Sequence, residues 1–191
     1  MGGRILGFAL GIALVMSACG ARSGPRVSPI PPTTIAPIPS DALPGAAAAP
    51  AVIDITTLSA DAVDVAGLRE LLQDSNFVAG TQRVFSRVQH GRRRLLARVL
   101  DFGAPSGADA YLAWIGAHAA DVIGRAGPRE GPGIPHGSVY EHEPNPCCHN
   151  DTRIFLAAWS HGSTVLTLEV GGPGARASDV APLVERLDAA V

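Results

Sequence analysis

The chain has 191 residues, with 15 basic and 17 acidic side chains and a formal net charge of −2. This balance excludes the strongly basic surface that nucleic-acid binding requires, so we expect no nucleic-acid partner. Every basic residue is arginine, which is typical of a GC-rich genome. Beyond residue 50 there are about 140 residues, enough for one domain with a single core.

The first residues have the layout of an export signal. Arg4 supplies a positive charge, an uninterrupted apolar run covers residues 5–16, and small residues follow. A helical run of about twelve residues spans roughly 18 Å, well short of the roughly 30 Å hydrocarbon core of a bilayer. The pattern therefore predicts a cleaved signal peptide over residues 1–18 and not a permanent transmembrane helix.

The segment Val15-Met16-Ser17-Ala18-Cys19-Gly20 closes this signal and resembles the lipobox of bacterial lipoproteins. The resemblance implies cleavage before Cys19, a thioether-linked diacylglyceryl group on Cys19, and localisation at the extracytoplasmic face of the cell membrane. Two acyl chains give the strength that stable membrane anchoring needs. The alternative is a plain secreted protein in which Cys19 has no special role.

The next segment differs in composition from the rest of the chain. Residues 20–50 contain eight of the sixteen prolines and one acidic residue, and they show no apolar periodicity. Proline fixes φ and removes a backbone donor, so such a segment stays extended and solvated. We therefore predict a lipidated, disordered tether over residues 19–50 and a single domain over residues 51–191.

The first half of that domain predicts a helix, two strands and a second helix. A helix from Ser59 to Gln73, capped by Ser59, comes first because its apolar residues fall near one face. Strands over Thr81–Gln89 and Arg94–Phe102 follow, joined by a turn at His90-Gly91. After a Gly/Pro-rich break, the apolar stripe of residues 108–123 predicts the second helix.

The second half predicts a similar order of elements. Strands are expected over Ser138–Glu143, Thr152–Ser160 and Thr164–Val170, and a helix follows a cap at Ser178. Both halves run strand, turn, strand, Gly/Pro-rich break and helix, which suggests a ββα unit used twice. We therefore predict an α+β domain, an antiparallel sheet with helices packed on it.

Together, the lipobox at Cys19, the Pro/Ala/Thr-rich tether and one small α+β domain resemble exported lipoproteins of high-GC Gram-positive, actinobacterial type. Within that class, the element order is similar to PsbP-like lipoproteins and, more distantly, to the extracellular sensor domains of mycobacterial Ser/Thr kinases. The resemblance implies a domain that binds ligands or partners without catalysing a reaction.

The loop Asn145-Pro146-Cys147-Cys148-His149 places two thiols side by side. If Cys19 is lipidated, Cys147 and Cys148 remain, and an oxidising exported space favours their oxidation. Adjacent Cα atoms lie about 3.8 Å apart, below the usual disulfide range of about 4.4 to 6.8 Å, so a Cys147–Cys148 disulfide would be strained. The alternatives are intermolecular pairing, free thiols, or a copper or zinc site that adds His149 and His142.

Catalytic motifs are absent from the sequence. The chain contains no G-x-S-x-G, no H-E-x-x-H and no P-loop. Ser163 and His161 lie close together, but a hairpin turn through Gly162 explains both. Glu141 and Glu143 would share a strand face as a solvent-facing pair of like charges. We therefore predict that the protein is not an enzyme, and we assign no cofactor.

Two further features have a structural and a functional interpretation. Trp114 and His118 are four residues apart and share a helix face. The structural interpretation is an amphipathic flank, and the functional alternative is a ligand-binding edge. The run Arg92-Arg93-Arg94 follows a turn. The structural interpretation is a solvated hairpin end, and the functional alternative is a contact for anionic lipid or wall polymer.

The sequence as a whole predicts a membrane-anchored extracytoplasmic lipoprotein that acts as a binding or accessory module for an unidentified ligand or envelope partner. The alternative is a copper- or zinc-binding or thiol-redox protein centred on the Cys147-Cys148-His149 loop.

Overall fold

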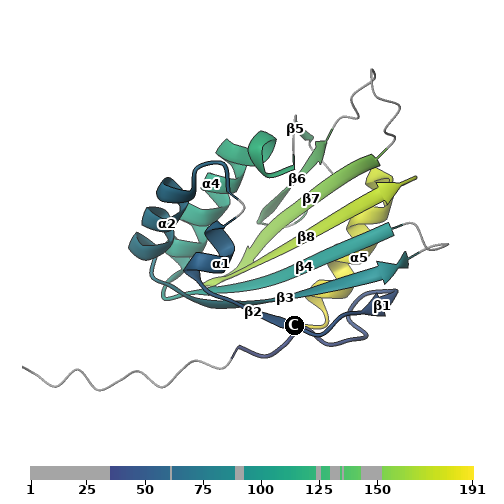
Figure 1. Cartoon of the computed structure of the whole chain (residues 1–191), viewed down its shortest axis with the longest axis horizontal. Helices are drawn as coiled ribbons and strands as arrows, with labels where there is room; N and C mark the ends of the chain where they lie inside the picture. The colour runs from purple at the N-terminus through teal and green to yellow at the C-terminus, as the bar shows by residue number, and fades with distance from the viewer. Residues whose placement is uncertain are drawn as a thin grey trace, which may run out of the picture. The chain divides into compact units, whose positions relative to one another are not determined.

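The computed structural model describes residues 35–60, 62–88, 93–123, 126–129, 134, 136–142 and 152–191. These residues belong to one compact unit, Pro32–Val191. An antiparallel sheet runs through the unit, with helices packed on it (Figure 1). The predicted α+β class is therefore confirmed.

The sheet contains eight strands within the described residues. Their spatial order is β1-β3-β4-β8-β7-β6-β5, with β2 also paired to β3, and every pair is antiparallel. The long strands β4 and β8 lie side by side near the centre of the sheet. The strand bounds are β1 Ala46–Ala47, β2 Ala51–Ile53, β3 Phe77–Arg87, β4 Arg93–Phe102, β5 Ala126–Arg129, β6 Gly137–His142, β7 Thr152–His161 and β8 Thr164–Pro173.

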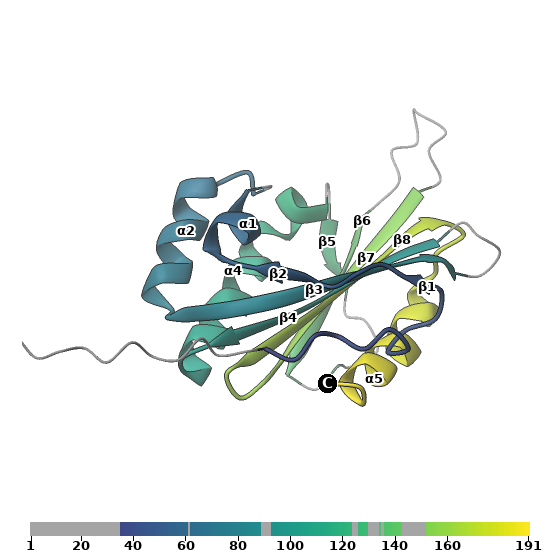
Figure 2. The ribbon, with the colours of Figure 1, turned by 60° about the horizontal axis from the view of Figure 1, so that its bottom comes forward.

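Helices cover both faces of the sheet. Figure 2 shows α1, α2 and α4 on one face and α5 on the other. A short 3-10 turn, η1, leads into α5. The bounds are α1 Ile55–Ser59, α2 Val65–Asp74, α4 Pro105–Ile123, η1 Ala177–Asp179 and α5 Val180–Asp188.

Two hydrophobic cores form because successive strand residues point to opposite faces. On β4, Leu95 and Ala97 pack in the core that α5 closes with Val180, Val184 and Leu187. Leu100 and Phe102 of the same strand pack in the core that α4 closes with Ala108, Tyr111, Ile115 and Ala119. Both cores lie wholly within Pro32–Val191, so a fragment of these residues contains the packing that stabilises the fold.

The repeated order of elements is present, but the two helices are not equivalent. The strands β3-β4 and β7-β8 form two hairpins, and α4 and α5 follow them along the chain. Because neighbouring β4 and β8 are antiparallel, a two-fold axis relating the hairpins would place both helices on the same face. They lie on opposite faces, so the two ββα units do not superpose as whole units.

The helix predicted from Ser59 to Gln73 is two helices, and its predicted cap is wrong. Asp54 caps α1 by accepting a 2.7 Å hydrogen bond from the Thr57 amide, and Asp64 caps α2 by accepting a 2.9 Å bond from the Gly67 amide. Ser59 instead ends α1 and is buried. A second aspartate cap therefore restarts the helix where the apolar pattern alone indicates continuity.

Two other predicted element starts shift. The strand expected from Thr81 begins at Phe77, and its pairing with β4 is irregular between Phe77 and Ala79. Ser178, expected as the cap of the last helix, lies inside η1, and α5 begins at Val180.

Residues 35–50, predicted to belong to the disordered tether, pack on the domain. Ile38 is 0% exposed and Leu43 is 2% exposed, because both contribute to the core under α5. From α5, Arg186 donates a 3.0 Å hydrogen bond from Nε to the Ala42 carbonyl and a 2.8 Å bond from Nη2 to the Asp41 carbonyl. The packed part of the chain therefore begins before residue 51.

Candidate binding cleft

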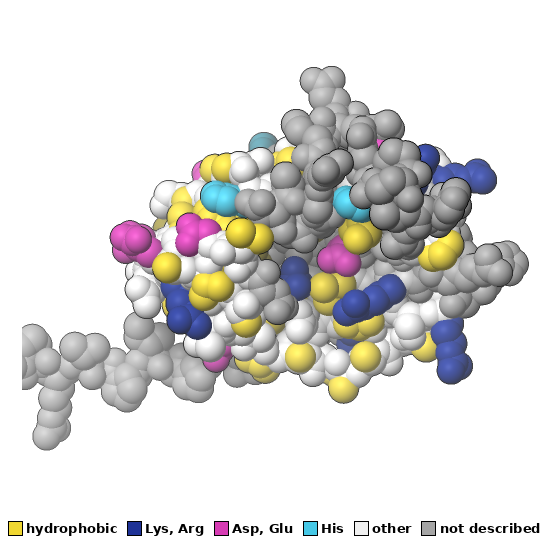
Figure 3. All heavy atoms as spheres, turned by 45° about the horizontal axis from the view of Figure 1, so that its top comes forward, with side chains coloured by type: hydrophobic (Ala, Val, Ile, Leu, Met, Phe, Trp, Pro, Cys, Tyr) yellow, Lys and Arg dark blue, Asp and Glu magenta, His cyan; other side chains and the backbone are white. Residues whose placement is uncertain are grey.

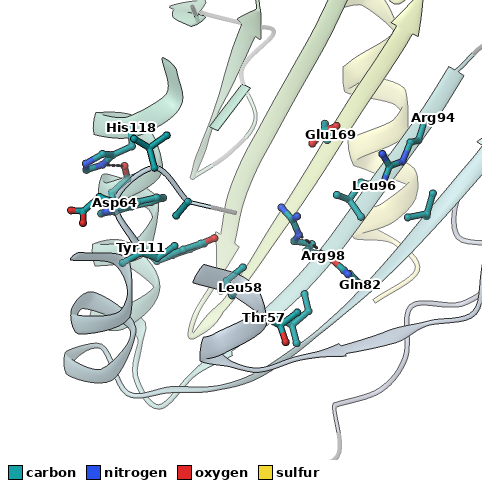
Figure 4. A pocket seen from close by; sticks show the side chains of 16 residues that line it. Thr57, Leu58, Asp64, Gln82, Arg94, Leu96, Arg98, Tyr111, His118 and Glu169 are labelled. Atoms are coloured by element: carbon teal, nitrogen blue, oxygen red, sulfur yellow. Dashed lines mark hydrogen bonds between the residues drawn. The ribbon is translucent and has the colours of Figure 1, made fainter. Parts of the chain in front are cut away.

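A cleft of about 380 Å³ opens between the helices and one part of the sheet (Figure 4). Helices α1, α2 and α4 form its walls, and strands β3, β4 and β8 form its floor. The floor residues are Gln82, Val84, Arg94, Leu96, Arg98 and Glu169. On the walls, the residues are mainly apolar or aromatic, and they include Leu58, Val63, Leu68, Tyr111, Trp114 and His118.

Strand register brings the floor residues together. On β4, alternation places Arg94, Leu96 and Arg98 on the helix side of the sheet. Leu96 lies opposite Val84 of β3 and opposite Glu169 of β8. The floor is thus built from the β3-β4 hairpin and from β8, which is distant in sequence.

Arg98 is held in place by its neighbour across the strands. It lies opposite Gln82, and its Nε donates a 3.3 Å hydrogen bond to the Gln82 side-chain oxygen. This bond fixes the plane of the guanidinium group relative to the floor.

The charges on the floor are not balanced within the described residues. Arg94 and Arg98 contribute two guanidinium groups, and Glu169 contributes one carboxylate. In that part of the chain, neither arginine forms a salt bridge. Asp64, whose carboxylate caps α2, also lines the cleft, so the lining as a whole carries two arginines and two carboxylates. Figure 3 shows basic and acidic side chains among hydrophobic ones on one face of the molecule.

The aromatic wall of the cleft lies on α4. The rings of Tyr111 and Trp114 are stacked with centroids 6.3 Å apart, and those of Trp114 and His118 are stacked with centroids 4.4 Å apart. Trp114 and His118 therefore share a face, as predicted, and both line the cleft. Their position at the cleft favours the alternative interpretation of this pair, a ligand-binding edge.

A local break in α4 orients His118. Its backbone angles, φ −115° and ψ 15°, are not helical. Its Nδ1 lies 2.9 Å from the Trp114 carbonyl oxygen, and since a carbonyl only accepts, Nδ1 carries the proton in this contact. A side chain that bonds the carbonyl four residues earlier is a known cause of a helix kink.

Tyr111 is a neutral hydrogen-bonding group at the base of this wall. Burial raises the pKa of its phenol to about 12, although the positive charge of Arg98 acts in the opposite direction. The side chain is 5% exposed and points from α4 toward the floor of the cleft (Figure 4). At neutral pH the phenol therefore keeps its proton and can donate it in a hydrogen bond.

Several residues singled out in the sequence lie elsewhere. Cys19, Cys147, Cys148 and His149 fall outside the described residues, so the lipid attachment, the disulfide and the metal alternative stay predictions. Within the described ranges, no group of three or more His, Cys, Asp or Glu side chains could hold a metal ion.

The glutamate prediction is wrong for Glu141. This residue is 4% exposed, and its Oε1 lies 3.6 Å from Nη1 of Arg153. It faces the α5 side of the sheet beside Phe155, so it contributes nothing to the cleft. Glu143, its predicted partner, lies outside the described residues.

The hairpin interpretation of His161 and Ser163 is confirmed. Gly162 turns the chain between β7 and β8 with a φ of +58°, which glycine adopts without strain. His161 Nε2 lies 2.5 Å from Asp188 Oδ1 at the end of α5, on the side of the sheet away from the cleft.

Sequence reasoning missed Gln82, Arg98 and Glu169. The available signal was on β4, where Arg94 and Arg98 interrupt one face of a strand whose other face is apolar from Leu95 to Val99. A half-polar face in the middle of a sheet marks a part that no helix covers.

Comparison with known proteins finds structural similarity without a sequence match. No protein-family model and no curated protein sequence matches the chain. A solved structure, the extracellular domain of PknH from Mycobacterium tuberculosis, aligns with a TM-score of 0.45 and 13% identity over 75% of this chain and 84% of that chain. None of the described helices has the length and apolar character to cross a membrane.

Proposed function

We propose that the protein is a membrane-anchored, extracytoplasmic module that binds a ligand in the cleft between α1, α2, α4 and the sheet. The cleft itself is the observation that supports this function. Its volume of about 380 Å³ lies in the range of roughly 300 to 1,000 Å³ that small-molecule sites occupy. Apolar walls with a few convergent polar groups, here Gln82, Arg98 and Glu169, are the usual composition of such sites.

The anchor and the location are supported by the sequence. The apolar run and the lipobox-like segment before Cys19 favour export and a diacylglyceryl group on Cys19. The membrane is thus one partner of the protein, and the bound ligand or an envelope protein is the other. The module binds without catalysing a reaction, a view supported by the lack of catalytic motifs in the sequence.

Co-purification tests the binding function. The full chain is isolated from membranes of its own host, and small molecules released from it by organic solvent are measured by mass spectrometry. Thr57→Trp places a large ring at an exposed position that lines the cleft, whereas Val52→Trp places the same ring at an exposed site away from it. We expect a compound that accompanies wild type and Val52→Trp but not Thr57→Trp. Equal recovery from all three, or from none, contradicts the proposed function.

A separate experiment tests the anchor. Cells are fed an alkyne-bearing fatty acid, and wild type is compared with Cys19→Ala by labelling and by membrane fractionation. We expect label and membrane association in wild type and neither in Cys19→Ala. Label that persists in Cys19→Ala contradicts attachment at this residue.

A further inference from the structure

The guanidinium group of Arg98 lines the cleft, and its two terminal nitrogens can bind a ligand. With Nε bonded to Gln82, the N–H groups on its two terminal nitrogens are left, and no hydrogen bond or ion pair with another described residue engages them. A guanidinium fork matches the two oxygens of a carboxylate or phosphate, and such bidentate pairs are among the strong hydrogen bonds in proteins.

Other groups reinforce the preference for an anion at this position. Arg94 lies four residues away on the same strand face, beyond Leu96, and adds a second positive charge to the cleft. Tyr111 is neutral and points toward the part of the cleft that Arg98 occupies (Figure 4). Glu169 on the floor and Asp64 on the wall are the carboxylates of the lining, but Asp64 caps α2, so the terminal nitrogens of Arg98 and the neutral O–H group of Tyr111 are the donors left for an anion.

Beside Thr57, Asp64 and His118, the rest of the cleft lining contains several apolar side chains. Leu58 and Leu68 line it from α1 and α2, Trp114 lines it from α4, and Leu96 lies on the floor. Val63 also lines the cleft and is 75% exposed, so this part of the apolar lining is accessible to a ligand. An apolar group of the ligand would cover this surface.

We infer that the ligand is an amphipathic organic anion, with a carboxylate or phosphate head on Arg98 and an aliphatic or aromatic portion against Leu58, Val63 and Trp114. This inference rests on the proposed function, because it names the ligand class of the same cleft. At about 30 Å³ for each water molecule, the cleft volume corresponds to roughly a dozen waters. A ligand portion of roughly a dozen non-hydrogen atoms therefore fills it.

Calorimetry with octyl compounds tests the ligand class. The fragment Pro32–Val191, first checked for a cooperative thermal transition, is titrated with octanoate and octyl phosphate below their micelle concentrations. Octanol and octyltrimethylammonium carry the same chain with a neutral or a cationic head, and acetate and inorganic phosphate supply the heads alone. We expect at least about tenfold tighter binding of one or both octyl anions than of octanol, the cation or either head alone.

Two variants and their matched controls locate the binding. Arg98→Met removes the charge from the floor, whereas Arg87→Met makes the same change at an exposed position outside the cleft. Val63→Asp places a negative charge at the rim, whereas Val52→Asp places it on β2, where the side chain is 80% exposed. Each cleft variant is expected to weaken octyl-anion binding by about tenfold or more, and each control by less than about twofold.

The outcomes separate this inference from the proposed function. Equal or tighter binding of octanol or octyltrimethylammonium shows that the head need not be an anion, and weakening of that binding by Thr57→Trp would still locate it in the cleft. Equal binding of inorganic phosphate and octyl phosphate contradicts the inference that the ligand has an apolar portion. Binding of neither octyl anion with a dissociation constant below about 1 mM also overturns the ligand class. The co-purification experiment then decides separately whether the cleft binds any ligand.

Discussion

Trp159 on β7 donates a 2.8 Å hydrogen bond from its indole nitrogen to Asp188 Oδ1 at the end of α5. The ring itself is 1% exposed, so this bond pairs a buried donor with a carboxylate near the surface. It joins the C-terminal helix to the sheet on the face opposite the cleft.

Replacing Asp188 by alanine should lower the stability of the fold. The change leaves the buried Trp159 indole N–H without its acceptor, which costs about 1 to 3 kcal/mol of unfolding free energy. Urea unfolding of the fragment Pro32–Val191 measures the loss. As a control, Asp109→Ala removes an exposed carboxylate from α4 and should change the unfolding free energy by less than about 0.5 kcal/mol. Equal losses in the two variants would show that the indole contact adds nothing.

The same contact makes stability depend on pH. Burial raises the pKa of Asp188, but hydrogen bonds from Trp159 and His161 outweigh it and leave the pKa below its ordinary value of 3.8. A depressed pKa contributes stability above the ordinary value, and that contribution disappears as pH falls through the pKa of the folded state. We therefore expect the stability difference between wild type and Asp188→Asn to shrink as pH falls below about 4. A difference that grows with acidification has the opposite sign and contradicts this assignment.

The segment before residue 51 should be essential to the domain. Ile38 is 0% exposed in the core under α5, so Ile38→Ala should lower the unfolding free energy by about 2 to 5 kcal/mol. Val52→Ala, at a side chain that is 80% exposed, should change it by less than about 0.5 kcal/mol. Thermal unfolding of both variants provides the comparison. An Ile38→Ala protein as stable as Val52→Ala would place residues 35–50 back in the tether.

A glycine at the start of α4 allows two helices to meet. A Cβ added at Gly107 would overlap the carbonyl oxygen of Ser75, the residue that caps the end of α2. Gly107→Ala should therefore lower the unfolding free energy by about 1 to 3 kcal/mol. At Gly116 on the same helix, the nearest atom to an added Cβ is the Tyr140 hydroxyl at 3.1 Å, at the end of a side chain. If Gly116→Ala proves as damaging as Gly107→Ala in urea unfolding, the backbone overlap is not the cause.

The elements that the sequence predicted best are those with a strong local pattern. Strand β4 was expected over Arg94–Phe102 and covers Arg93–Phe102, because alternation and the preceding turn define it. Helix α4 was expected from Ala108 and begins at Pro105, three residues earlier. Between α1 and α2 the apolar pattern continues, but α1 ends at Ser59 and the cap at Asp64 starts α2, so periodicity alone misled.

The cleft could not be predicted because it depends on contacts distant in sequence. Arg98 meets Gln82 inside the predicted β3-β4 hairpin, but Leu96 meets Glu169 only through the pairing of β4 with β8, which no local pattern indicates. Which part of the sheet remains uncovered depends on where α1, α2 and α4 pack, and no local pattern specifies that. Trp114 and His118 were recognised as neighbours on one helix face, but only the fold places them beside a polar floor.

The most direct test of the cleft as an anion-binding site uses the two tryptophans as reporters. The indole N–H of Trp114 belongs to the aromatic wall, and that of Trp159 is bonded to Asp188 on the opposite face. Amide and indole NMR signals of ¹⁵N-labelled fragment Pro32–Val191 are followed during titration with octyl phosphate. The account predicts that the signals of the Trp114 indole and of the amides around Leu58 and Leu96 shift in a saturable manner. The signal of the Trp159 indole should not move. Shifts confined to the surroundings of Trp159, or no saturable shift at the cleft, would contradict it.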